Sequence, residues 1–393
     1  MRGIVGVIVV AGLSLGASQG DQGKLNSLTP KEATDGWLLL FDGETPYGWT
    51  ATMPGKLTAQ NANLRFEGAG SFQTNTAFPE YALQFQCRIT AAQAHEDVRL
   101  NFRNTTVKFA LPNDKFTGWK TAKLLVTGKR YKFTMTAGST DFPVVDGELA
   151  DLLAGPISFT VAKGVSLEIR NVILMPLGQK PLFNGKNLDG WHEFKGAKYV
   201  SKFSVNDKLE LNVKNGPGDL QTDGKYADFL LQLDCLSNGK HLNSGVFFRC
   251  KPNEYQNGYE CQIHNGWNAQ ADKVYSLDHF DPMTHKLLKT EKIKSAAIDG
   301  GTGGIYRRIP ARKQVAKDFE WFTLTLAAHG NHIATWVNGI QVCDWTDNRA
   351  ANVNPRNGCR LEAGHISIQG HDPTTDLSFR KIRIADYLAA EKK

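Results

Sequence analysis

The sequence predicts an all-β protein built from two antiparallel β-sandwiches in tandem, and three observations predict it. The 393 residues amount to about two or three typical domains. Glycine is frequent, with 38 residues, and the 8 Trp, 10 Tyr and 21 Phe are spread along the chain, which favours short strands joined by turns. Apolar and polar residues alternate in many segments, whereas helical periodicity is scarce.

The composition excludes two classes of protein. Hydrophobic residues make up 41% of the chain and charged residues 22%, which excludes a mainly disordered protein. The net charge of +7 comes from scattered residues and not from a Lys/Arg-rich run. We therefore expect no nucleic-acid partner.

The first residues are typical of a secretory signal peptide. Arg2 precedes an apolar stretch over residues 3–17, which ends in small residues around Ala17 and is followed by a polar run. The stretch is shorter than the ~18 residues of a spanning helix, although an uncleaved anchor is the alternative. We expect a signal peptide over residues 1–20, no transmembrane segment after its removal, and an exported protein, periplasmic or extracellular.

Four sequence blocks occur twice in the same order. Residues 38–51, "LLLFDGETPYGWTA", match residues 180–193, "KPLFNGKNLDGWHE", without a gap. "YALQFQCRIT" matches "FLLQLDCLSN", "YKFTMTAG…VVDG" matches "WFTLTLAA…WVNG", and "GPISF…LEIRNVIL" matches "GHISI…LSFRKIRI". The pattern predicts an internal duplication, with a first domain over residues 35–176 and a second over residues 180–388.

Both copies alternate as half-buried strands do. "FLLQLDC" places Phe229, Leu231, Leu233 and Cys235 on one face, and "FTLTLAA" and "LSFRKIRI" alternate likewise. Asn-Gly, Asp-Gly and Gly-Pro turns recur between the strands, which is typical of antiparallel sandwiches.

The second copy carries an insertion that a sandwich core does not need. About seventy residues separate "SGVFFRC" from "WFTLTL", whereas fewer than thirty separate the matching blocks of the first copy. The additional residues include "GYECQIHNGW", "SLDHFD" and "GTGGIYRRIPARK". We therefore expect the functional site in the second domain and a structural or interaction role for the first.

One strand face of the second copy collects polar and aromatic side chains. If residues 243–250 pair with residues 259–264, Val246, Phe248 and Cys250 point into the core with Tyr259, Cys261 and Ile263. The opposite face then carries Phe247, Arg249, Glu260, Gln262 and His264, and the later strands add Ser367, Gln369, His371, Ala334, Trp336 and Asn338. This composition suits a carbohydrate-binding concavity, although the wet face of an ordinary sheet is the alternative.

Two further features are less specific. Residues 301–312 form a glycine-rich loop with Tyr306 and Arg307, either a lid over a ligand or a solvated loop. Nothing in it fits a Walker motif, and the chain has no serine-hydrolase elbow or zincin motif.

A divalent metal stays open, because the residues that could ligate one have no defined spacing: His264, Asp278, His279, Asp281 and His285. Of the six cysteines, Cys250 and Cys261 flank a predicted hairpin turn and are the best candidates for a disulfide.

At these residues the second copy resembles the 3-keto-disaccharide hydrolase domain family. The resemblance rests on "PLFNGKNLDGWH", "NSGVFFR", "GYECQIHN", "GTGGIYRR", "WVNGIQVCDW" and "GHISIQGHDPTTDLSFRKIRI", and it covers residues 180–388. It implies a concanavalin A-like jelly roll and cleavage of glycosides oxidised to a ketone at C3. The first copy keeps "LFDGETPYGW" but lacks the insertion motifs, so it resembles a degenerate copy.

The chemistry of such a substrate suggests roles for the polar face. A C3 carbonyl acidifies the C2 proton, so a base starts an elimination that expels the C1 substituent, and water then adds back. From this chemistry we assign Glu260 or His371 as the base, and Arg249, Tyr306 and Arg307 as groups that stabilise the oxyanion. The expected substrate-binding residues are Asn243, Gln262, His264, Trp267, Trp336, Asn338 and Gln369. The alternative functions are a non-catalytic carbohydrate-binding protein and a purely structural tandem sandwich.

Overall fold

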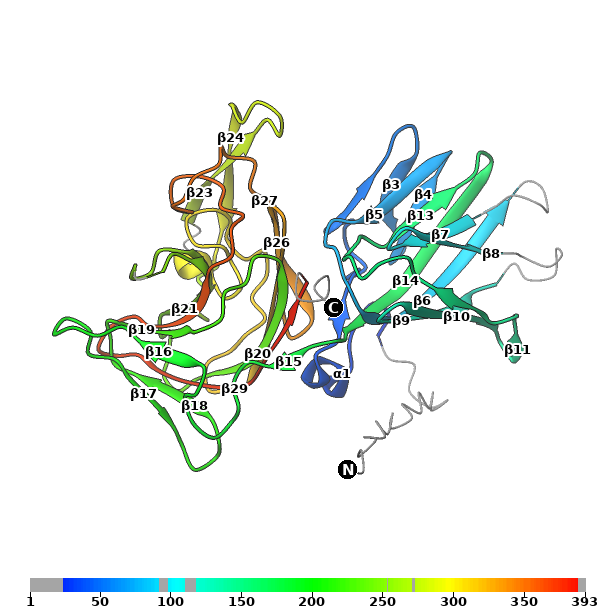
Figure 1. Cartoon of the computed structure of the whole chain (residues 1–393). Helices are drawn as coiled ribbons and strands as arrows, with labels where there is room; N and C mark the ends of the chain where they lie inside the picture. Colours follow the sequence, from blue (N-terminus) through cyan, green and yellow to red (C-terminus); the bar gives the residue numbers. More distant parts are fainter. Residues whose placement is uncertain (1–23, 92–97, 110–117, 253, 271–272, 388–393) are drawn as a thin grey trace, which may run out of the picture.

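The computed structural model describes residues 24–91, 98–109, 118–252, 254–270 and 273–387. Two β-sandwiches follow one another along the chain (Figure 1). The first sandwich comprises the strands β1 to β14 and the second sandwich the strands β15 to β29. The predicted fold class, two antiparallel β-sandwiches in tandem, is confirmed. The predicted signal peptide lies outside the described residues.

The first sandwich has a larger and a smaller sheet. The larger sheet and the short helix before it comprise α1 (Pro30–Asp35), β1 (Leu38–Leu39), β3 (Lys56–Gln60), β4 (Asn63–Glu67), β6 (Tyr81–Ala91), β9 (Lys120–Thr127), β10 (Arg130–Ala137), β11 (Thr140–Asp141), β12 (Val145–Glu148) and β14 (Val165–Pro176). The smaller sheet has the order β2 (Trp49–Ala51), β5 (Gly70–Thr74), β13 (Ser158–Val161), β7 (Val98–Phe102) and β8 (Thr105–Phe109).

The second sandwich repeats this arrangement and adds a ribbon. Its larger sheet comprises β15 (Lys180–Pro181), β17 (Lys202–Val205), β18 (Leu211–Lys214), β20 (Phe229–Ser237), β25 (Phe322–His329), β26 (His332–Val337), β27 (Ile340–Thr346) and β29 (Asp376–Asp386). Its smaller sheet has the order β16 (Trp191–Glu193), β19 (Gly218–Thr222), β28 (His365–Gly370), β21 (Ser244–Cys250) and β22 (Tyr259–Ile263). The ribbon of β23 (Lys273–Phe280) and β24 (Leu287–Ser295) precedes the 3-10 turn η1 (Ile298–Gly300).

Strand alternation decides which side chains fill each core. In β20, Phe229, Leu231 and Leu233 pack into the core of the second sandwich. The intervening Leu230 points the other way and joins the core of the first sandwich. Both faces of the larger sheet of the second sandwich are covered here, so β20 carries apolar side chains on both faces.

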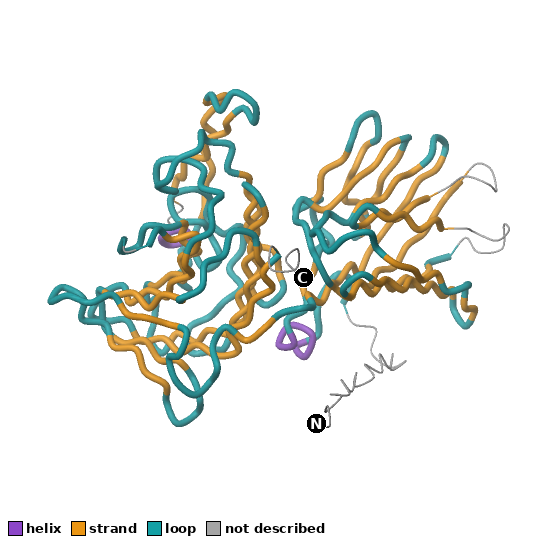
Figure 2. Tube along the Cα trace, in the orientation of Figure 1, coloured by secondary structure: helices purple, strands orange, loops and turns teal. Residues whose placement is uncertain are grey.

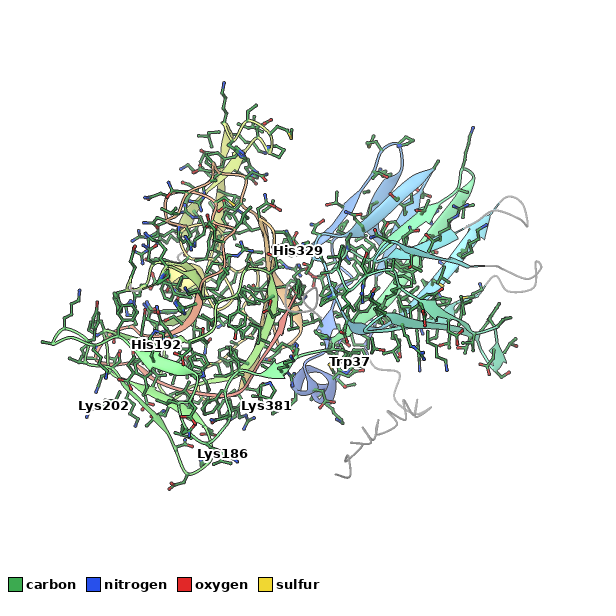
Figure 3. All side chains as sticks on the ribbon, viewed as in Figure 1. Trp37, Lys186, His192, Lys202, His329 and Lys381 are labelled. Carbon is green, nitrogen blue, oxygen red and sulfur yellow. The ribbon has the colours of Figure 1, made fainter. Side chains whose placement is uncertain are left out.

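The two sandwiches are joined by backbone pairing and by charged contacts. Leu39 of β1 pairs antiparallel with β14 and parallel with Ile340 of β27, so one hydrogen-bonded set of 17 strands runs through both sandwiches in the described residues. Asp42 accepts hydrogen bonds from Arg312 at 2.7 Å and Lys313 at 3.1 Å. Helix α1 lies beside this junction (Figure 2), where Trp37 and His329 are also found (Figure 3).

Several buried contacts recur in both sandwiches. Trp49 donates its indole N–H to the carbonyl of Leu40, and Trp191 donates its own to the carbonyl of Leu182. Thr74 and Thr222 each accept a backbone N–H of the neighbouring strand, from Ile157 and Ile366.

The most telling shared contact is a buried arginine with a left-handed backbone. Arg103 has φ 42° and Arg249 has φ 50°. Arg103 donates to the carbonyls of Pro79, Gly128 and Asp151, and Arg249 to those of Ala227 and Arg360 and to Asp228. In both sandwiches the guanidinium therefore closes the same end of the smaller sheet.

The predicted Cys250–Cys261 disulfide is wrong. All six cysteines lie within the described residues, and all are buried free thiols. Cys261 stands opposite Val246, and Phe248 stands opposite Tyr259, so the hairpin register places Cys250 beyond the last paired residue. None of the described helices is both long and apolar enough to cross a membrane.

Candidate active site

The candidate site lies on the free face of the smaller sheet of the second sandwich. Phe247 of β21 stands between Glu260 of β22 and Ser367 of β28, and Ser367 in turn stands opposite Gln221 of β19. A second row, two residues along each strand, contains Asp219, Gln369 and Gln262. Because side chains alternate along a strand, these residues share one face, and Leu220, Val246 and Ile368 fill the core behind it.

A cleft of about 370 Å³ opens on this face. Its floor is the sheet, and its rims come from the β21–β22 loop, the segment after η1 and the segment before β28. The cleft is lined by Pro217, Asn243, Phe247, Tyr255, Gln256, Gly258, Tyr259, Glu260, Gln262, Ile305, Tyr306, Arg307, Arg308, Pro355, Arg356, Gln369 and His371.

The glycine-rich segment is fixed to the edge of the sheet. The backbone N–H of Tyr306 donates to the Glu260 carbonyl at 2.9 Å, and the N–H of Gln262 donates to the Gly304 carbonyl at 2.9 Å. Gly303 has φ 89°, and a Cβ there would lie 2.4 Å from Val342, so this close approach requires glycine. The segment is a hydrogen-bonded rim that presents Tyr306 and Arg307 to the cleft, and the solvated-loop alternative is wrong.

Glu260 is the carboxyl group that the cleft holds in an unusual state. Burial raises the pKa of Glu260 from its ordinary 4.5 to about 7. Arg356 and Arg307 lower the pKa in part, whereas Asp219 raises it further. The side chain lies over Gly245, where an added Cβ would come within 2.8 Å of Glu260 Oε1.

Asp219 is a second carboxyl group of the site, and it is not among the residues predicted from the sequence. It is fully buried and accepts the backbone N–H of Gln256 at 3.1 Å. Burial raises its pKa from 3.8 to about 7. A signal was available: Asp219 lies two residues before the repeated Gln-Thr pair, where the first copy has Ser71.

Several buried polar atoms of this face have no hydrogen-bond partner among the residues that the structure describes. They are Gln221 Nε2 and Oε1, Asn243 Oδ1 and Gln369 Oε1. Folded proteins rarely leave buried polar groups unpaired unless water, an ion or a ligand satisfies them. Their concentration here indicates a face that is built to hydrogen-bond something.

Arginines form one wall of the cleft. Arg356 donates to the Gln256 carbonyl at 2.9 Å, and Arg308 donates to the Arg356 carbonyl at 2.6 Å. The Arg307 guanidinium lies 5.3 Å from the ring of Tyr306. The positive charge therefore faces Glu260 across the cleft.

Seven of the residues predicted from the sequence line this cleft together: Asn243, Glu260, Gln262, Tyr306, Arg307, Gln369 and His371. The side chain of His371 is 40% exposed at the rim, and its Nδ1 lies 2.8 Å from Asp372 Oδ2. Gln262 donates to the Asp299 carbonyl at 3.0 Å, which fixes its amide in place.

The prediction that Arg249 lies on this face is wrong. The register between β21 and β28 shifts between Phe247 and Cys250, and this β-bulge turns Arg249 away from the polar side. Its side chain has no exposure to solvent and serves the framework contacts described above.

The prediction that Trp336 and Asn338 share this face is also wrong. Trp336 points outward from its strand, as alternation predicts, but β26 belongs to the larger sheet, and the first sandwich covers that face. Its ring lies 6.4 Å from Phe78 in the core of the first sandwich. Asn338 has φ 47° in the β26–β27 turn and accepts the N–H of Thr323.

His264 and Trp267 lie beside the cleft but do not line it. His264 accepts the N–H of Gly266 through Nδ1 at 3.1 Å, and burial lowers its pKa. The backbone of Trp267 pairs with Ala297. Both residues hold the segment that follows β22, and their contact with substrate stays a prediction.

The side chains considered as metal ligands are dispersed. His279 faces Glu291 at 3.0 Å, Asp278 accepts the Thr290 hydroxyl, and Asp281 accepts the N–H of Thr284. Within the described parts of the chain, no three His, Cys, Asp or Glu side chains gather closely enough to hold an ion.

Comparison with known proteins gives matches to carbohydrate-active proteins. A model of the 3-keto-alpha-glucoside-1,2-lyase-like domain matches residues 178–385. A 3-keto-disaccharide hydrolase of Bacteroides thetaiotaomicron is 23% identical over 262 residues, which is 59% of this chain and 87% of that protein.

Solved structures match at lower similarity. A candidate glycosyl hydrolase of Parabacteroides distasonis is 19% identical, with 53% of this chain and 94% of that chain covered and a TM-score of 0.39. A carbohydrate binding module of Bacillus subtilis is 12% identical, with 49% and 93% covered and a TM-score of 0.30.

Proposed function

The chain belongs to the 3-keto-alpha-glucoside-1,2-lyase-like domain family, and on that premise we propose that its second sandwich cleaves 3-keto-glycosides in the cleft beside Glu260. One observation carries the proposal. Glu260 is a carboxyl group with a pKa of about 7, and it lines a polar cleft beside Arg307 and Arg356. A base with a pKa near the working pH is partly ionised and still basic enough to take a carbon-bound proton.

The reaction begins with proton transfer to Glu260. The carboxylate takes the proton from C2, and the C–H electrons form an enediolate with the C3 carbonyl. The negative charge collects on the C3 oxygen, where the guanidinium of Arg307 and the Tyr306 hydroxyl stabilise it. These two side chains share one rim of the cleft.

Elimination and hydration complete net hydrolysis. The enediolate restores the C3 carbonyl, forms a C1–C2 double bond and expels the C1 oxygen, which accepts a proton. Water then adds its oxygen to C1, and C2 regains a proton. His371 lines the same cleft with Nδ1 beside Asp372, an arrangement that leaves Nε2 to serve the leaving oxygen.

The remaining polar groups suit a sugar ring. Asn243 Oδ1 and Gln369 Oε1 are buried acceptors without partners, and sugar hydroxyls are donors that satisfy such atoms. Gln262 extends the same row of the sheet.

Turnover of a defined substrate tests the proposal. A disaccharide of glucose oxidised to the ketone at C3 is incubated with the protein, and the 3-keto-sugar and the released sugar are followed by NMR. We expect turnover by the wild type. In deuterated water we also expect deuterium from the solvent to be incorporated at C2. A parallel incubation with chelator tests the metal requirement. Absence of turnover both with and without added divalent metal, together with retained sugar binding, would favour a non-catalytic carbohydrate-binding protein.

Export and duplication are part of the same proposal. The signal-like residues 1–20 support export to the periplasm or beyond, where the substrate would be met. The four repeated blocks and the paired contacts of Arg103 and Arg249 support an origin by duplication. In this proposal the first sandwich is the copy without catalytic residues.

A further inference from the structure

We propose that the leaving sugar of the substrate binds in a second subsite, between the ribbon β23–β24 and Trp345, next to the cleft. This inference rests on the proposed function and assigns residues of this chain to the part of the site that receives the leaving sugar. Phe280, Trp345, Ser276 and Asp278 are the residues that would form the subsite.

The ribbon has no packing role that explains its presence. Its strands β23 and β24 pair from Lys273 opposite Ser295 to Phe280 opposite Leu287. Every described residue of the two strands is exposed or half-exposed. A two-stranded ribbon of this kind is marginal by itself in water, so the molecule must hold it from outside.

The structure holds the ribbon at both ends. At its base, the Tyr275 hydroxyl donates to the Ala297 carbonyl at 2.6 Å and accepts the N–H of Gly300 at 3.1 Å. At its tip, His285 Nδ1 lies 2.9 Å from the Asn348 carbonyl. The ribbon is therefore a fixed wall, which projects from the second sandwich (Figure 1).

A recess lies between this wall and the end of β27. It is lined by Ser276, Leu277, Asp278, Phe280, Arg307, Arg308, Trp345 and Arg349. Arg307 and Arg308 also line the cleft, so the recess continues the cleft on the far side of these two arginines. It encloses only about 30 Å³, so a sugar ring would lie against its lining side chains and not inside the recess.

The chemistry of the recess suits a sugar. Trp345 is half-buried and oriented by two neighbours: the Tyr259 ring packs edge-on at 6.3 Å, and the Arg349 guanidinium lies 5.9 Å from the indole. Asp347 binds both neighbours, through the Tyr259 hydroxyl and the Arg349 guanidinium, each at 2.7 Å. A fixed indole and the Phe280 ring offer apolar faces for the C–H face of a sugar, while Ser276 and Asp278 offer groups for its hydroxyls.

A comparison of two substrates tests this subsite. The 3-keto derivative of a glucose disaccharide fills both subsites, whereas the methyl 3-keto-glucoside fills the cleft alone. For Trp345→Ala and Phe280→Ala we expect kcat/KM to fall about tenfold on the disaccharide, a loss equal to one aromatic stacking contact. The methyl glycoside should lose less than about twofold. Leu288→Ala, an exposed position on the same ribbon, should change neither.

The outcomes separate the two proposals. An equal loss on both substrates, or no loss on either, overturns the subsite. If the wild type turns over neither substrate, the proposed reaction fails, and the subsite is then judged by calorimetry with the unoxidised disaccharide. A binding preference over methyl glucoside that Phe280→Ala abolishes would support the subsite, and equal binding would overturn it. Phe280→Ala also covers the case in which Trp345→Ala does not fold.

Discussion

The two sandwiches share a framework and differ on one face. In the first sandwich, Asn101 of β7 stands opposite Thr106 of β8 and Ser158 of β13. In the second sandwich the matching strands place Phe247 opposite Glu260 and Ser367. Thr106 therefore holds the place of Glu260, and a hydroxyl replaces the carboxyl group.

Hydrogen bonding on the two faces differs accordingly. The Asn101 amide donates to Thr160 at 2.9 Å and accepts from Thr106 at 2.9 Å, so these polar groups satisfy one another. On the second face, Gln221 Oε1, Asn243 Oδ1 and Gln369 Oε1 are buried without hydrogen-bond partners among the described residues. A polar sheet face is therefore not by itself a candidate site. It becomes one when its polar groups are buried and left without hydrogen-bond partners.

The largest expected effect is on turnover, and it separates the two faces most directly. Glu260→Gln should lower kcat by about 10² to 10⁴, the contribution of a positioned general base, while sugar binding is retained. Thr106→Ala, at the matching position of the first sandwich, should leave kcat unchanged. Steady-state kinetics on the 3-keto-disaccharide measure both, and a Glu260→Gln variant with normal kcat would remove Glu260 from the mechanism.

The next effect concerns stability and should be the same in both sandwiches. Arg249→Met and Arg103→Met each leave buried carbonyl groups unpaired, so each should lower the free energy of unfolding by about 3 kcal/mol. Thermal unfolding measures the loss. At a temperature where Arg249→Met is folded, its kcat should equal that of the wild type. If the folded Arg249→Met variant has a lower kcat than the wild type, Arg249 contributes to the site.

A pH effect should be confined to the second sandwich. The pKa of Asp219 is about 7 in the folded protein, against an ordinary 3.8, so folding favours its protonated form. Its contribution is neutral below pH 3.8 and becomes destabilising as the pH rises to about 7, by roughly 2 to 4 kcal/mol.

Asp219→Asn should reduce this decline of the free energy of unfolding with pH, measured by denaturant unfolding from pH 4 to pH 8. Ser71→Ala, at the matching position of the first sandwich, should retain it. Because Glu260 titrates in the same range and is coupled to Asp219, part of the slope should survive in Asp219→Asn. A variant with the full wild-type slope would show that Asp219 does not titrate in this way.

The smallest effect lies at the junction. Burial alone would raise the pKa of Asp42, but the backbone of Glu44 and the side chains of Arg312 and Lys313 lower it to about 2. The stabilisation is therefore present above the ordinary value of 3.8 and is lost as the pH falls through about 2. Asp42→Asn should cost about 1 kcal/mol at pH 7, measured by thermal unfolding, and the cost should disappear near pH 2. Glu44→Gln, at an exposed partner, should cost less.

Alternation within strands made most of the site predictable. Glu260, Gln262 and Gln369 share a face because strand side chains alternate, and this period can be read from the sequence. Alternation says nothing about which sheet a strand joins. Trp336 points outward as predicted, but its face belongs to the larger sheet and is covered by the first sandwich.

Other features depend on contacts between distant segments. The bulge that removes Arg249 from the polar face arises where β21 meets β28, more than a hundred residues along the chain. Asp219 joins the site because the β21–β22 loop returns to cover it and donates the Gln256 N–H. Neither the bulge nor the position of this loop produces a periodic pattern in the sequence, so neither could be predicted from it.

The covered position of Trp336 bears on how the protein can be divided. A fragment that starts at residue 178, where the family match begins, would bare Leu230, Ala327, Ala334 and Trp336, which now pack in the core of the first sandwich. A contiguous apolar patch of this kind makes a soluble protein aggregate. We therefore expect the first sandwich to keep this patch covered, and a fragment that lacks it to aggregate.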